Sequence, residues 1–515
     1  MRNTATITLN SHGFTVSDYN SEFYEKLKMY CARFTKYKMV PTMIHGRKIM
    51  KKEPDVQFGS AFKNRREVRL HMNCYQEFRR FMEQWGYNTS RFKEVKADIP
   101  LGKDANFEFK MEGIGPRDHQ VEWLEYQLER NQGDITTKIN TLQTGKGKSF
   151  CGIYNMVKLG KLTVIVLMPK YINGWLIALN DFVKLSETDI MVVQGSGELN
   201  GCMKLASEGK LKSRIIIVSL PTFQYFMKEY ETQDGVMTHY DYTPDDFWKL
   251  VQPGFMIVDE GHESIHALFK FDLYTNVRNK LVLSATLEAD DPFINDMYFV
   301  IYPNKIRFKG GAYDKYIEAV ALMYGLVNGK KVKCKGFGGS YNHVKFEQSI
   351  MKDKHLLASY LGLIERTFNF FFKNKMEPNQ RCLVYCATVE MCLYVADHLD
   401  RKNPDLIVRK YTQEDPKSTL YESDVSVSTL KSAGTGVDIP GLRTCIMTIA
   451  IGSRQASDQA LGRLRRLKDY PDTTPTFVYF VCTGIEQHVS YHRKKQELFP
   501  VKTLSLKEMN SNFSL

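Results

Sequence analysis

The nonapeptide VDEGHESIH, from Val258 to His266, places two acids, a glycine and a histidine directly after an apolar run. That run, GFMIVDE, is too short for a helix and predicts a buried strand of a parallel sheet, ending at Asp259 and Glu260. In open α/β sheets, ligands bind at the carboxyl ends of the strands. Two carboxylates at such an end suit a metal ion and a water molecule. The alternative is a strand that simply exits into solvent.

The composition is that of a globular protein large enough for about three domains. The chain has 515 residues, of which 43% are apolar, and no apolar run approaches the roughly 18 residues of a membrane span. There is no secretory-type apolar segment at the start, and the ten cysteines form no CxxC pair. We therefore expect core thiols and a reducing, cytoplasmic setting.

The net charge is +13, and it is concentrated near the beginning of the chain. Residues 1–110 contain 21 Lys and Arg against 12 Asp and Glu, a net charge of +9. A basic end domain predicts a polyanion partner. A generally basic surface is the alternative.

Two series of short apolar runs, separated by helical patterns, predict an α/β fold with two consecutive parallel sheets, each covered on both faces. The first series is TVIVLMP, RIIIVSL, FMIVDE and KLVLSAT; the second is CLVYCAT, VSVSTL, TCIMTIA and TFVYFVC. Before them, two strand-and-helix units form a small basic module, with DVQFGSAFKNRRE as a loop between the units. The predicted domains are an accessory nucleic-acid-binding domain (1–108), a first lobe (109–310), a linker or insertion (311–350), a second lobe (351–485) and a C-terminal helical tail (486–515).

The segment TGKGKS, residues 144–149, has the composition of a phosphate-binding loop at the start of a helix. Glycines let backbone amides approach phosphate oxygens, and the helix N-terminus adds partial positive charge. Lys148 would reach the β- and γ-phosphates, and Ser149 would hold Mg²⁺. The generic pattern has a glycine where this chain has Leu142, so the loop alone could also be a surface turn.

Together with this loop, the acidic pair predicts nucleotide hydrolysis. Asp259 would bind Mg²⁺, and Glu260 would orient and deprotonate the attacking water. In the second lobe, QALGRLRR places Gln459, Arg463 and Arg466 at helical spacings of 4 and 3, which predicts one shared helix face. Arginines at an ATP site stabilise charge on the transferred phosphoryl group. We therefore expect an ATP site between the two lobes; a solvated basic helix face is the alternative.

In their order along the chain, these motifs resemble those of superfamily 2 helicases of the DExH type, over residues 115–485. The matching stretches are PRDHQ (116–120), TGKGKS (144–149), VLMPKYINGW (166–175), VSLPTFQ (218–224), VDEGH (258–262), LSAT (283–286), CLVYCAT (382–388), STLKSAGTGVDIPGL (428–442) and QALGRLRR (459–466). PRDHQ, TGVDIPGL and the compact second lobe are similar to phage UvsW-like DNA helicases. The family does not require a glycine at position 142, whereas Gly261 stands where it usually has alanine.

The resemblance implies two tandem RecA-like lobes with ATP and Mg²⁺ as cofactors, and it assigns roles to further residues. Nucleotide contacts would come from Gln120, Thr144, Gly145, Lys146, Gly147, Lys148, Ser149, Gly436 and Asp438, with Gln120 reading the adenine. A relay between the ATP and nucleic-acid sides would use His262, Ser284 and Thr286. The phosphate-backbone track would be lined by Pro169, Lys170, Thr222, Thr388 and Ser432. Trp175 lies either near a bound strand or in an apolar core.

The function expected from this resemblance is that of an ATP-dependent DNA helicase or translocase. It would unwind or branch-migrate junctions, D-loops or R-loops in recombination, repair or replication. The expected partners are single-stranded and branched duplex DNA, with RNA in R-loops and no membrane, for a monomer in the host cytoplasm if the chain is phage-encoded. Three alternatives stay open: an RNA helicase, a double-stranded DNA translocase that does not unwind, and a nucleic-acid binder with a decayed motor.

Overall fold

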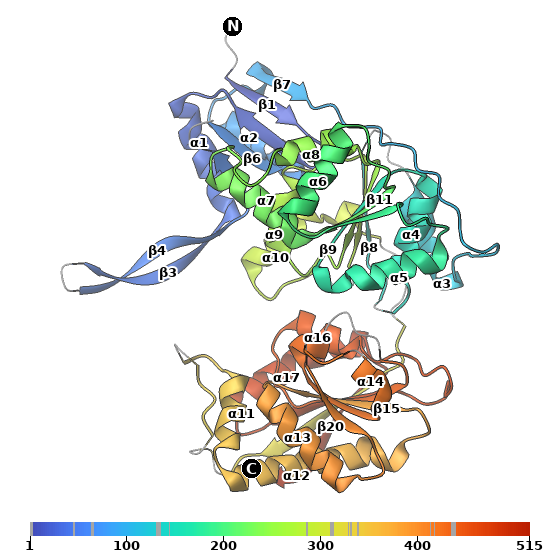
Figure 1. Cartoon of the computed structure of the whole chain (residues 1–515). Coiled ribbons are helices and arrows are strands. Elements are labelled where there is room, and N and C mark those ends of the chain that lie inside the picture. The colour runs from blue at the N-terminus through green and yellow to red at the C-terminus, as the bar shows by residue number, and fades with distance from the viewer. Residues whose placement is uncertain are drawn as a thin grey trace. The chain divides into compact units, whose positions relative to one another are not determined.

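The computed structural model divides the chain into two compact units, residues 1–311 and 312–515. The structure describes residues 4–44, 47–62, 66–129, 135–143, 145–284, 287–308, 314–327, 329, 332–336, 339–412, 414–416, 418–433 and 439–515. Each unit is an α/β fold built on a large parallel sheet, as the apolar runs predicted (Figure 1). None of the helices in these ranges has the length and apolar character needed to cross a membrane.

The first unit begins with a mixed sheet of five strands in the order β5-β6-β2-β1-β7. Its strands are β1 (Ala5–Leu9), β2 (Gly13–Ser17), β5 (Ser60–Phe62), β6 (Glu67–His71) and β7 (Phe92–Lys96). The helices α1 (Ser21–Cys31) and α2 (Tyr75–Gln84) accompany this sheet. Between them, β3 (Thr35–Ile44) and β4 (Arg47–Gln57) form a separate two-stranded antiparallel ribbon. The stretch predicted as a loop, DVQFGSAFKNRRE, therefore contains the end of β4 and all of β5.

The second sheet of the first unit has six parallel strands in the order β10-β11-β9-β12-β13-β8. The strands are β8 (Thr136–Asn140), β9 (Thr163–Leu167), β10 (Ile190–Val193), β11 (Ile215–Ser219), β12 (Phe255–Asp259) and β13 (Asn279–Leu283). The helices are α3 (Asp118–Leu128), α4 (Lys148–Leu159), α5 (Ile172–Phe182), α6 (Ser196–Ser207), α7 (Leu220–Thr232), α8 (Pro244–Val251), α9 (Ile265–Asp272) and α10 (Pro292–Ile301). The register places Val258 opposite Val166 of β9 and Val282 of β13, so β12 is central and fully paired.

Alternating side chains of the six-stranded sheet enter two different cores, because successive residues of a strand point to opposite faces. In β11, Ile215 and Ile217 pack on one face, and Ile216 and Val218 on the other. The second of these cores continues without a break into the N-terminal sheet, where it includes Phe14. The basic module and the first lobe therefore share one core.

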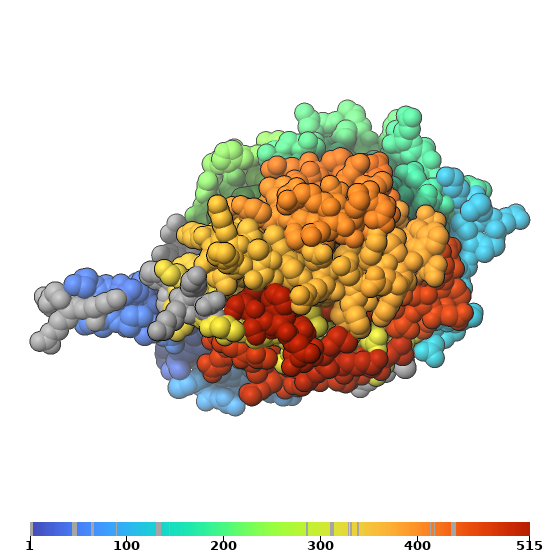
Figure 2. All heavy atoms as spheres, turned by 90° about the horizontal axis from the view of Figure 1, so that it is seen from below, coloured from blue at the N-terminus to red at the C-terminus, as the bar shows by residue number. Residues whose placement is uncertain are grey.

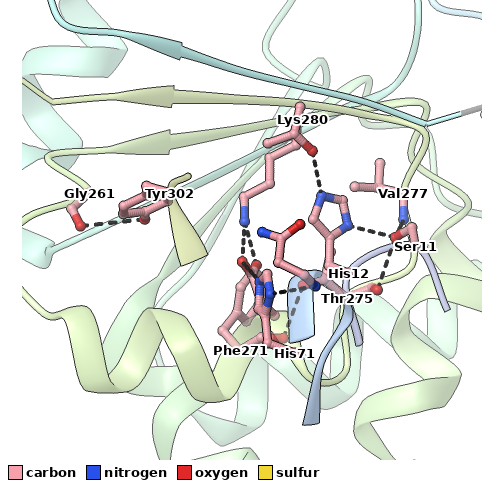
Figure 3. A network of polar contacts seen from close by, with 12 residues as sticks. Ser11, His12, His71, Gly261, Phe271, Thr275, Val277, Lys280 and Tyr302 are labelled. Atoms are coloured by element: carbon pink, nitrogen blue, oxygen red, sulfur yellow. Dashed lines mark hydrogen bonds and ion pairs between the residues drawn. The ribbon is translucent and has the colours of Figure 1, made fainter. Parts of the chain in front are cut away.

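A buried polar network also joins the N-terminal sheet to the first lobe (Figure 3). The Ser11 hydroxyl donates to the Thr275 carbonyl at 3.0 Å, and His71 Nε2 lies 3.3 Å from Asp272 Oδ2. Asp272 also forms an ion pair with Lys280, and both side chains are only 2% exposed. The Lys280 ammonium holds the pKa of the Asp272 carboxyl well below its usual range, although burial acts in the opposite direction.

The second unit has seven parallel strands in the order β16-β17-β15-β18-β19-β14-β20. The strands are β14 (Glu318–Gly325), β15 (Arg381–Cys386), β16 (Val408–Tyr411), β17 (Val425–Thr429), β18 (Leu442–Met447), β19 (Thr476–Cys482) and β20 (Ser505–Ser514). The helices are α11 (His343–Met351), α12 (Lys354–Phe371), α13 (Val389–Lys402), α14 (Ser418–Glu422), α15 (Leu430–Ala433), α16 (Arg454–Leu461) and α17 (Glu486–Leu498).

Two expectations about this unit are wrong. The stretch 311–350 is not simply a linker or insertion, because β14 lies within it and pairs with both β19 and β20. The tail 486–515 is not wholly helical, because β20 follows α17 and completes the sheet. Both strands are held by partners far away in the sequence, which local patterns do not reveal.

Candidate functional site

The phosphate-loop stretch connects β8 to α4 through two glycines in the left-handed region. Gly145 has φ +85° and Gly147 has φ +83°, a conformation that side-chain-bearing residues rarely adopt. Lys148 and Ser149 are the first two residues of the twelve-residue helix α4. The predicted contact Thr144 lies outside the described residues. The sequence therefore folds as a turn leading into a helix N-terminus, where an anion is favoured.

The side chain of Gln120, in α3, is hydrogen-bonded to this loop. Its Nε2 donates to the Lys146 carbonyl at 2.9 Å, and its Oε1 accepts from the Arg117 amide at 2.9 Å. A Cβ at position 147 would lie only 2.4 Å from Gln120 Nε2, so close packing as well as φ requires a glycine there. Both ends of the Gln120 amide thus engage the protein's own backbone, and adenine reading by Gln120 stays a prediction.

Lys148 is buried at the start of α4, with 8% of its surface exposed. Its Nζ donates to the carbonyl of Leu142 at 3.2 Å. The Leu142 side chain packs with Trp123, Leu124 and Cys151, between α3 and α4. The leucine that departs from the generic loop pattern therefore serves as a core residue, and its backbone holds the lysine.

The acidic pair lies at the carboxyl end of β12, as predicted. The indole N–H of Trp175 donates to Asp259 Oδ2 at 2.7 Å, and the Glu260 amide donates to Asp259 Oδ1 at 3.0 Å. Burial, together with the negative charge of Glu260, raises the pKa of the Asp259 carboxyl to about 7. The positive charge of Lys148 acts in the opposite direction, so the loop lysine and the strand-end acid are within electrostatic reach.

Trp175 was expected either near a bound strand or in an apolar core, and the structure places it in the core. It is 2% exposed and packs in the core beneath α4, and it also donates a hydrogen bond to the acid at the site. Its indole N–H is hydrogen-bonded to Asp259, whereas its ring packs against apolar core residues, as is common for buried tryptophan. Trp175 and Asp259 are 84 positions apart, and no sequence pattern indicates this contact.

The turn after Asp259 is tightly constrained. Glu260 has φ +48°, which is uncommon outside glycine, and its Oε2 lies 3.3 Å from His262 Nδ1. A Cβ at Gly261 would lie 2.6 Å from Val282 Cγ1 and 3.1 Å from the Tyr302 hydroxyl oxygen, and Figure 3 shows Tyr302 beside Gly261. Packing therefore accounts for glycine where the resembling family usually has alanine.

His262 and Ser284, two of the predicted relay residues, are in contact. His262 Nδ1 lies 3.0 Å from the Ser284 hydroxyl, and both residues are buried. Burial lowers the pKa of His262, which favours the neutral imidazole. The third relay residue, Thr286, lies outside the described residues. The relay itself stays a prediction.

The residues predicted to line a nucleic-acid track in the first unit are largely engaged within the protein. Lys170 Nζ donates to Glu263 Oε1 at 2.9 Å, and Tyr171 donates to the same oxygen. Pro169 begins the short 3-10 helix η4 (Pro169–Tyr171) that carries them. Thr222 is only 6% exposed, and its contact with phosphate stays a prediction.

In the second unit, Thr388 is also committed to another partner. Its hydroxyl and its amide both donate to Glu347 Oε2 at 2.8 Å, and the Ala387 amide donates to Glu347 Oε1 at 2.7 Å. Glu347 belongs to α11, is fully buried and accepts these hydrogen bonds beside the N-terminus of α13; the phosphate contact of Thr388 stays a prediction. Ser432 bonds to the Thr429 hydroxyl at 2.9 Å. No local pattern indicates the role of Glu347, which is 41 residues from Thr388.

The predicted arginine face is not formed. Gln459 is in α16, but that helix ends at Leu461 with Gly462 as its C-cap, so Arg463 and Arg466 lie beyond it. Arg463 is 8% exposed, whereas Arg466 is largely exposed and pairs with Asp314 at 2.6 Å. Gly436 and Asp438 lie outside the described residues. Participation of these five residues in ATP hydrolysis stays a prediction.

The donor set at the first-unit site fits a nucleotide with Mg²⁺. Mg²⁺ takes hard oxygen ligands and is usually held by one or two carboxylates together with substrate phosphates. Ser149 and Asp259 supply such oxygens, and a cation would relieve the unfavourable charge that raises the pKa of Asp259. No cluster of three or more His, Cys, Asp or Glu able to hold a metal exists among the described residues.

The chain forms a small N-terminal mixed sheet followed in sequence by two large parallel sheets. This order defines an N-terminal domain and two tandem RecA-like lobes. Among solved structures, the chain is similar to the helicase domain of Pyrococcus furiosus Hef, with 12% identity, a TM-score of 0.44, and coverage of 75% of this chain and 100% of that one. T4 UvsW matches at 11% identity and a TM-score of 0.33, over 99% of this chain and 100% of that one. The Type ISP restriction-modification enzyme LlaBIII, bound to DNA, matches at 14% identity and a TM-score of 0.47, over 83% of this chain and 34% of that one.

The helicase domain of Hef and T4 UvsW are thus among the solved structures to which this chain is similar. A scan against protein-family models gives no match, and neither does a search of curated proteins. At these low TM-scores the likenesses carry no argument about activity, which depends on the site itself.

Proposed function

We propose that this protein is an ATP-dependent DNA helicase or translocase that remodels branched DNA. The observation that carries the proposal is the pairing, within one unit, of a left-handed glycine loop at a helix N-terminus with a buried strand-end acid. Asp259 is held by Trp175 at 2.7 Å and lies within electrostatic reach of Lys148. Such an arrangement is typical of phosphoryl transfer, where positioning and charge stabilisation supply nearly all of the catalysis.

The roles of the residues follow from their places. Backbone amides after Gly145 and Gly147 would bind phosphate oxygens, and the Lys148 ammonium would neutralise their charge. Ser149 and Asp259 would hold Mg²⁺, which with ATP supplies the electrophilic phosphoryl group. Glu260 would orient a water molecule and accept its proton.

The indole of Trp175 keeps the Asp259 carboxylate in one orientation by a hydrogen bond to Oδ2. The buried contact between His262 and Ser284 connects the turn after Glu260 to the end of β13. The choice of DNA as substrate is supported by the basic N-terminal module and by the motifs that resemble UvsW-like helicases. Junctions, D-loops and R-loops are the substrates that we propose.

The test is steady-state ATP hydrolysis without nucleic acid and with single-stranded DNA, duplex DNA, a four-way junction or single-stranded RNA. We expect the strongest stimulation with branched DNA. Stimulation by RNA alone would identify an RNA helicase, and stimulation by duplex DNA without strand separation would identify a non-unwinding translocase.

Variants connect the activity to the site. Lys148→Ala and Glu260→Gln should abolish hydrolysis, whereas Lys158→Ala, an exposed lysine on the same helix, should not. Hydrolysis that survives both site variants would show that the assigned residues do not form the active site. No hydrolysis by the unaltered protein under any condition would point to a decayed motor.

A further inference from the structure

The ribbon of β3 and β4 extends away from the sheets and helices of the first unit (Figures 1 and 2, blue). Its strands pair antiparallel from Thr35 opposite Gln57 to Ile44 opposite Arg47. At about 3.4 Å per residue, a ten-residue strand spans roughly 34 Å. A ribbon of this length outside the core is available to a binding partner.

The two faces of the ribbon differ in chemistry. Directly opposite residues share a face, so Tyr37, Met39 and Pro41 lie with their partners Pro54, Lys52 and Met50, and the register places Met43 and its partner Lys48 on the same face. Met39, Met43 and Met50 are 56%, 67% and 51% exposed. They are three of the five exposed methionines in the described part of the chain.

On the other face, basic residues are matched with acids. Lys38 pairs with Asp55 at 3.0 Å, and Lys51 pairs with Glu53 at 3.4 Å. Lys52, on the apolar face, lies 4.5 Å from the centre of the Tyr37 ring. One face therefore carries paired charges together with Val40 and the exposed Ile49, whereas the other, the methionine face, presents exposed methionines with the charge of Lys52 among them.

The edges of the ribbon are poor sites for adding a strand. β3 contains Pro41 and β4 contains Pro54, and proline lacks the amide hydrogen that such pairing requires. A partner would therefore bind through side chains, on the methionine face.

The ribbon is firmly rooted in the first lobe. Phe34 and Phe58, at its two ends, are fully buried, and their rings lie 6.2 Å and 5.1 Å from that of Phe269 in α9. His266 Nε2 lies 2.8 Å from the Gln57 carbonyl, and Lys36 forms an ion pair with Asp291 at the start of α10. The arm is thus attached to the helix that begins five residues after Glu260.

We propose that the methionine face docks in the major groove of duplex DNA. The occupant must be anionic, because residues 35–57 contain six Lys and Arg against two Asp and Glu, a net +4 of the +9 in residues 1–110. The major groove of B-DNA is about 12 Å wide and admits a two-stranded ribbon, and the thymine methyl groups on its floor accept apolar contacts. A-form RNA has a deep, narrow major groove that excludes such an arm, so DNA is the occupant. The inference rests on the proposed function only in taking the anionic partner to be a nucleic acid.

The first test is binding of the full chain, without nucleotide, to fluorescent duplex DNA, single-stranded DNA and duplex RNA. The variant Met39→Ser/Met43→Ser/Met50→Ser should bind duplex DNA about tenfold more weakly, corresponding to about 1.4 kcal/mol, and single-stranded DNA unchanged. Met111→Ser, 64% exposed and outside the ribbon, is the matched control and should have no effect. If the triple variant binds duplex DNA as tightly as the unaltered chain does, the proposal is wrong. This holds even if a protein binds the methionine face.

The second test does not depend on a variant. Duplex DNA with 5-iodouracil in place of thymine carries its photoreactive group in the major groove. We expect cross-links to peptides from residues 35–57, and cross-links confined to other segments would contradict the proposal. Ribbon-dependent binding together with absent ATP hydrolysis would sustain this inference while refuting the motor function, so the two can fail separately.

Discussion

Replacing Gly261 with alanine tests how closely packing controls the turn that carries the acidic pair. The new Cβ would lie 2.6 Å from Val282 Cγ1 and 3.1 Å from the Tyr302 hydroxyl oxygen, and both neighbours are fully buried. Carbon atoms in contact prefer about 3.5–4.0 Å, so an overlap of roughly 1 Å must be relieved by movement. Overpacking of this kind costs about 1–3 kcal/mol.

Part of that cost is offset in the unfolded chain. Alanine restricts the unfolded backbone and contributes about 0.4–1 kcal/mol in favour of folding where φ is compatible. Since Gly261 is not among the residues with positive φ, that gain applies. The net expectation is a destabilisation of about 0–2.6 kcal/mol, measured by urea and thermal denaturation.

The same variant should impair hydrolysis more than its stability change suggests. Glu260 precedes the substitution in a left-handed conformation, and His262 follows it in contact with Ser284. A shift of the turn by about 1 Å would displace the proposed base and reduce kcat by about 10- to 100-fold, with a small effect on the KM for ATP.

A second substitution identifies the cause. In a Val282→Ala background, the closest clashing atom is gone, so adding Gly261→Ala should cost about 1–2 kcal/mol less than in the natural chain. Gly201→Ala in α6, where an added Cβ meets nothing within 4 Å, is the control and should be neutral or stabilising. A Gly261→Ala variant as stable and active as the natural protein, with no coupling to Val282, would refute the packing argument.

Three further expectations concern charge. Trp175→Phe removes the N–H donor to Asp259 and should raise the pKa of that carboxyl above its value of about 7. Since the carboxylate is the metal-binding form, kcat/KM should then reach its plateau at a higher pH than in the natural protein, as a pH–rate profile would show. Asp272→Asn leaves the Lys280 charge buried without its ion pair and should destabilise the fold by about 3–5 kcal/mol in urea titration, while Asp272→Asn/Lys280→Met should recover much of the loss. DNA affinity should fall steeply with salt, because phosphate contacts release counterions, and a flat dependence would contradict DNA binding through charge.

The central strands of both sheets were predictable from the sequence because both of their faces are buried. Such strands need apolar residues at every position, and β9 and β11 are continuous apolar runs. Among the strands that escaped prediction, β14 is largely apolar, whereas others have different compositions. β20 is half exposed and polar, and the β3–β4 ribbon is rich in lysine and methionine. Their pairing is decided by the partner strand and by solvent, not by local periodicity.

The candidate site also contains residues that the sequence reveals and contacts that it does not. The loop glycines, Lys148 and the strand-end acids are contiguous in sequence, so spacing and residue type are enough to find them. The Trp175–Asp259 and Thr388–Glu347 contacts join residues that are 84 and 41 positions apart, and no local pattern encodes them. The predicted arginine face failed for a related reason: regular spacing assumed a helix that in fact ends at Leu461.

Helix α9 connects the ribbon to the proposed ATP site. Its first residue, Ile265, follows Glu260 by five positions, while Phe269 packs against both ends of the ribbon. Its last residue, Asp272, forms the buried ion pair with Lys280 of β13. The N-terminal module cannot swing freely on the first lobe, because His71 contacts this buried Asp272 and the module shares one hydrophobic core with the lobe. Duplex DNA held by the ribbon would therefore move with the whole first unit, and a displacement of that unit would act directly on the DNA.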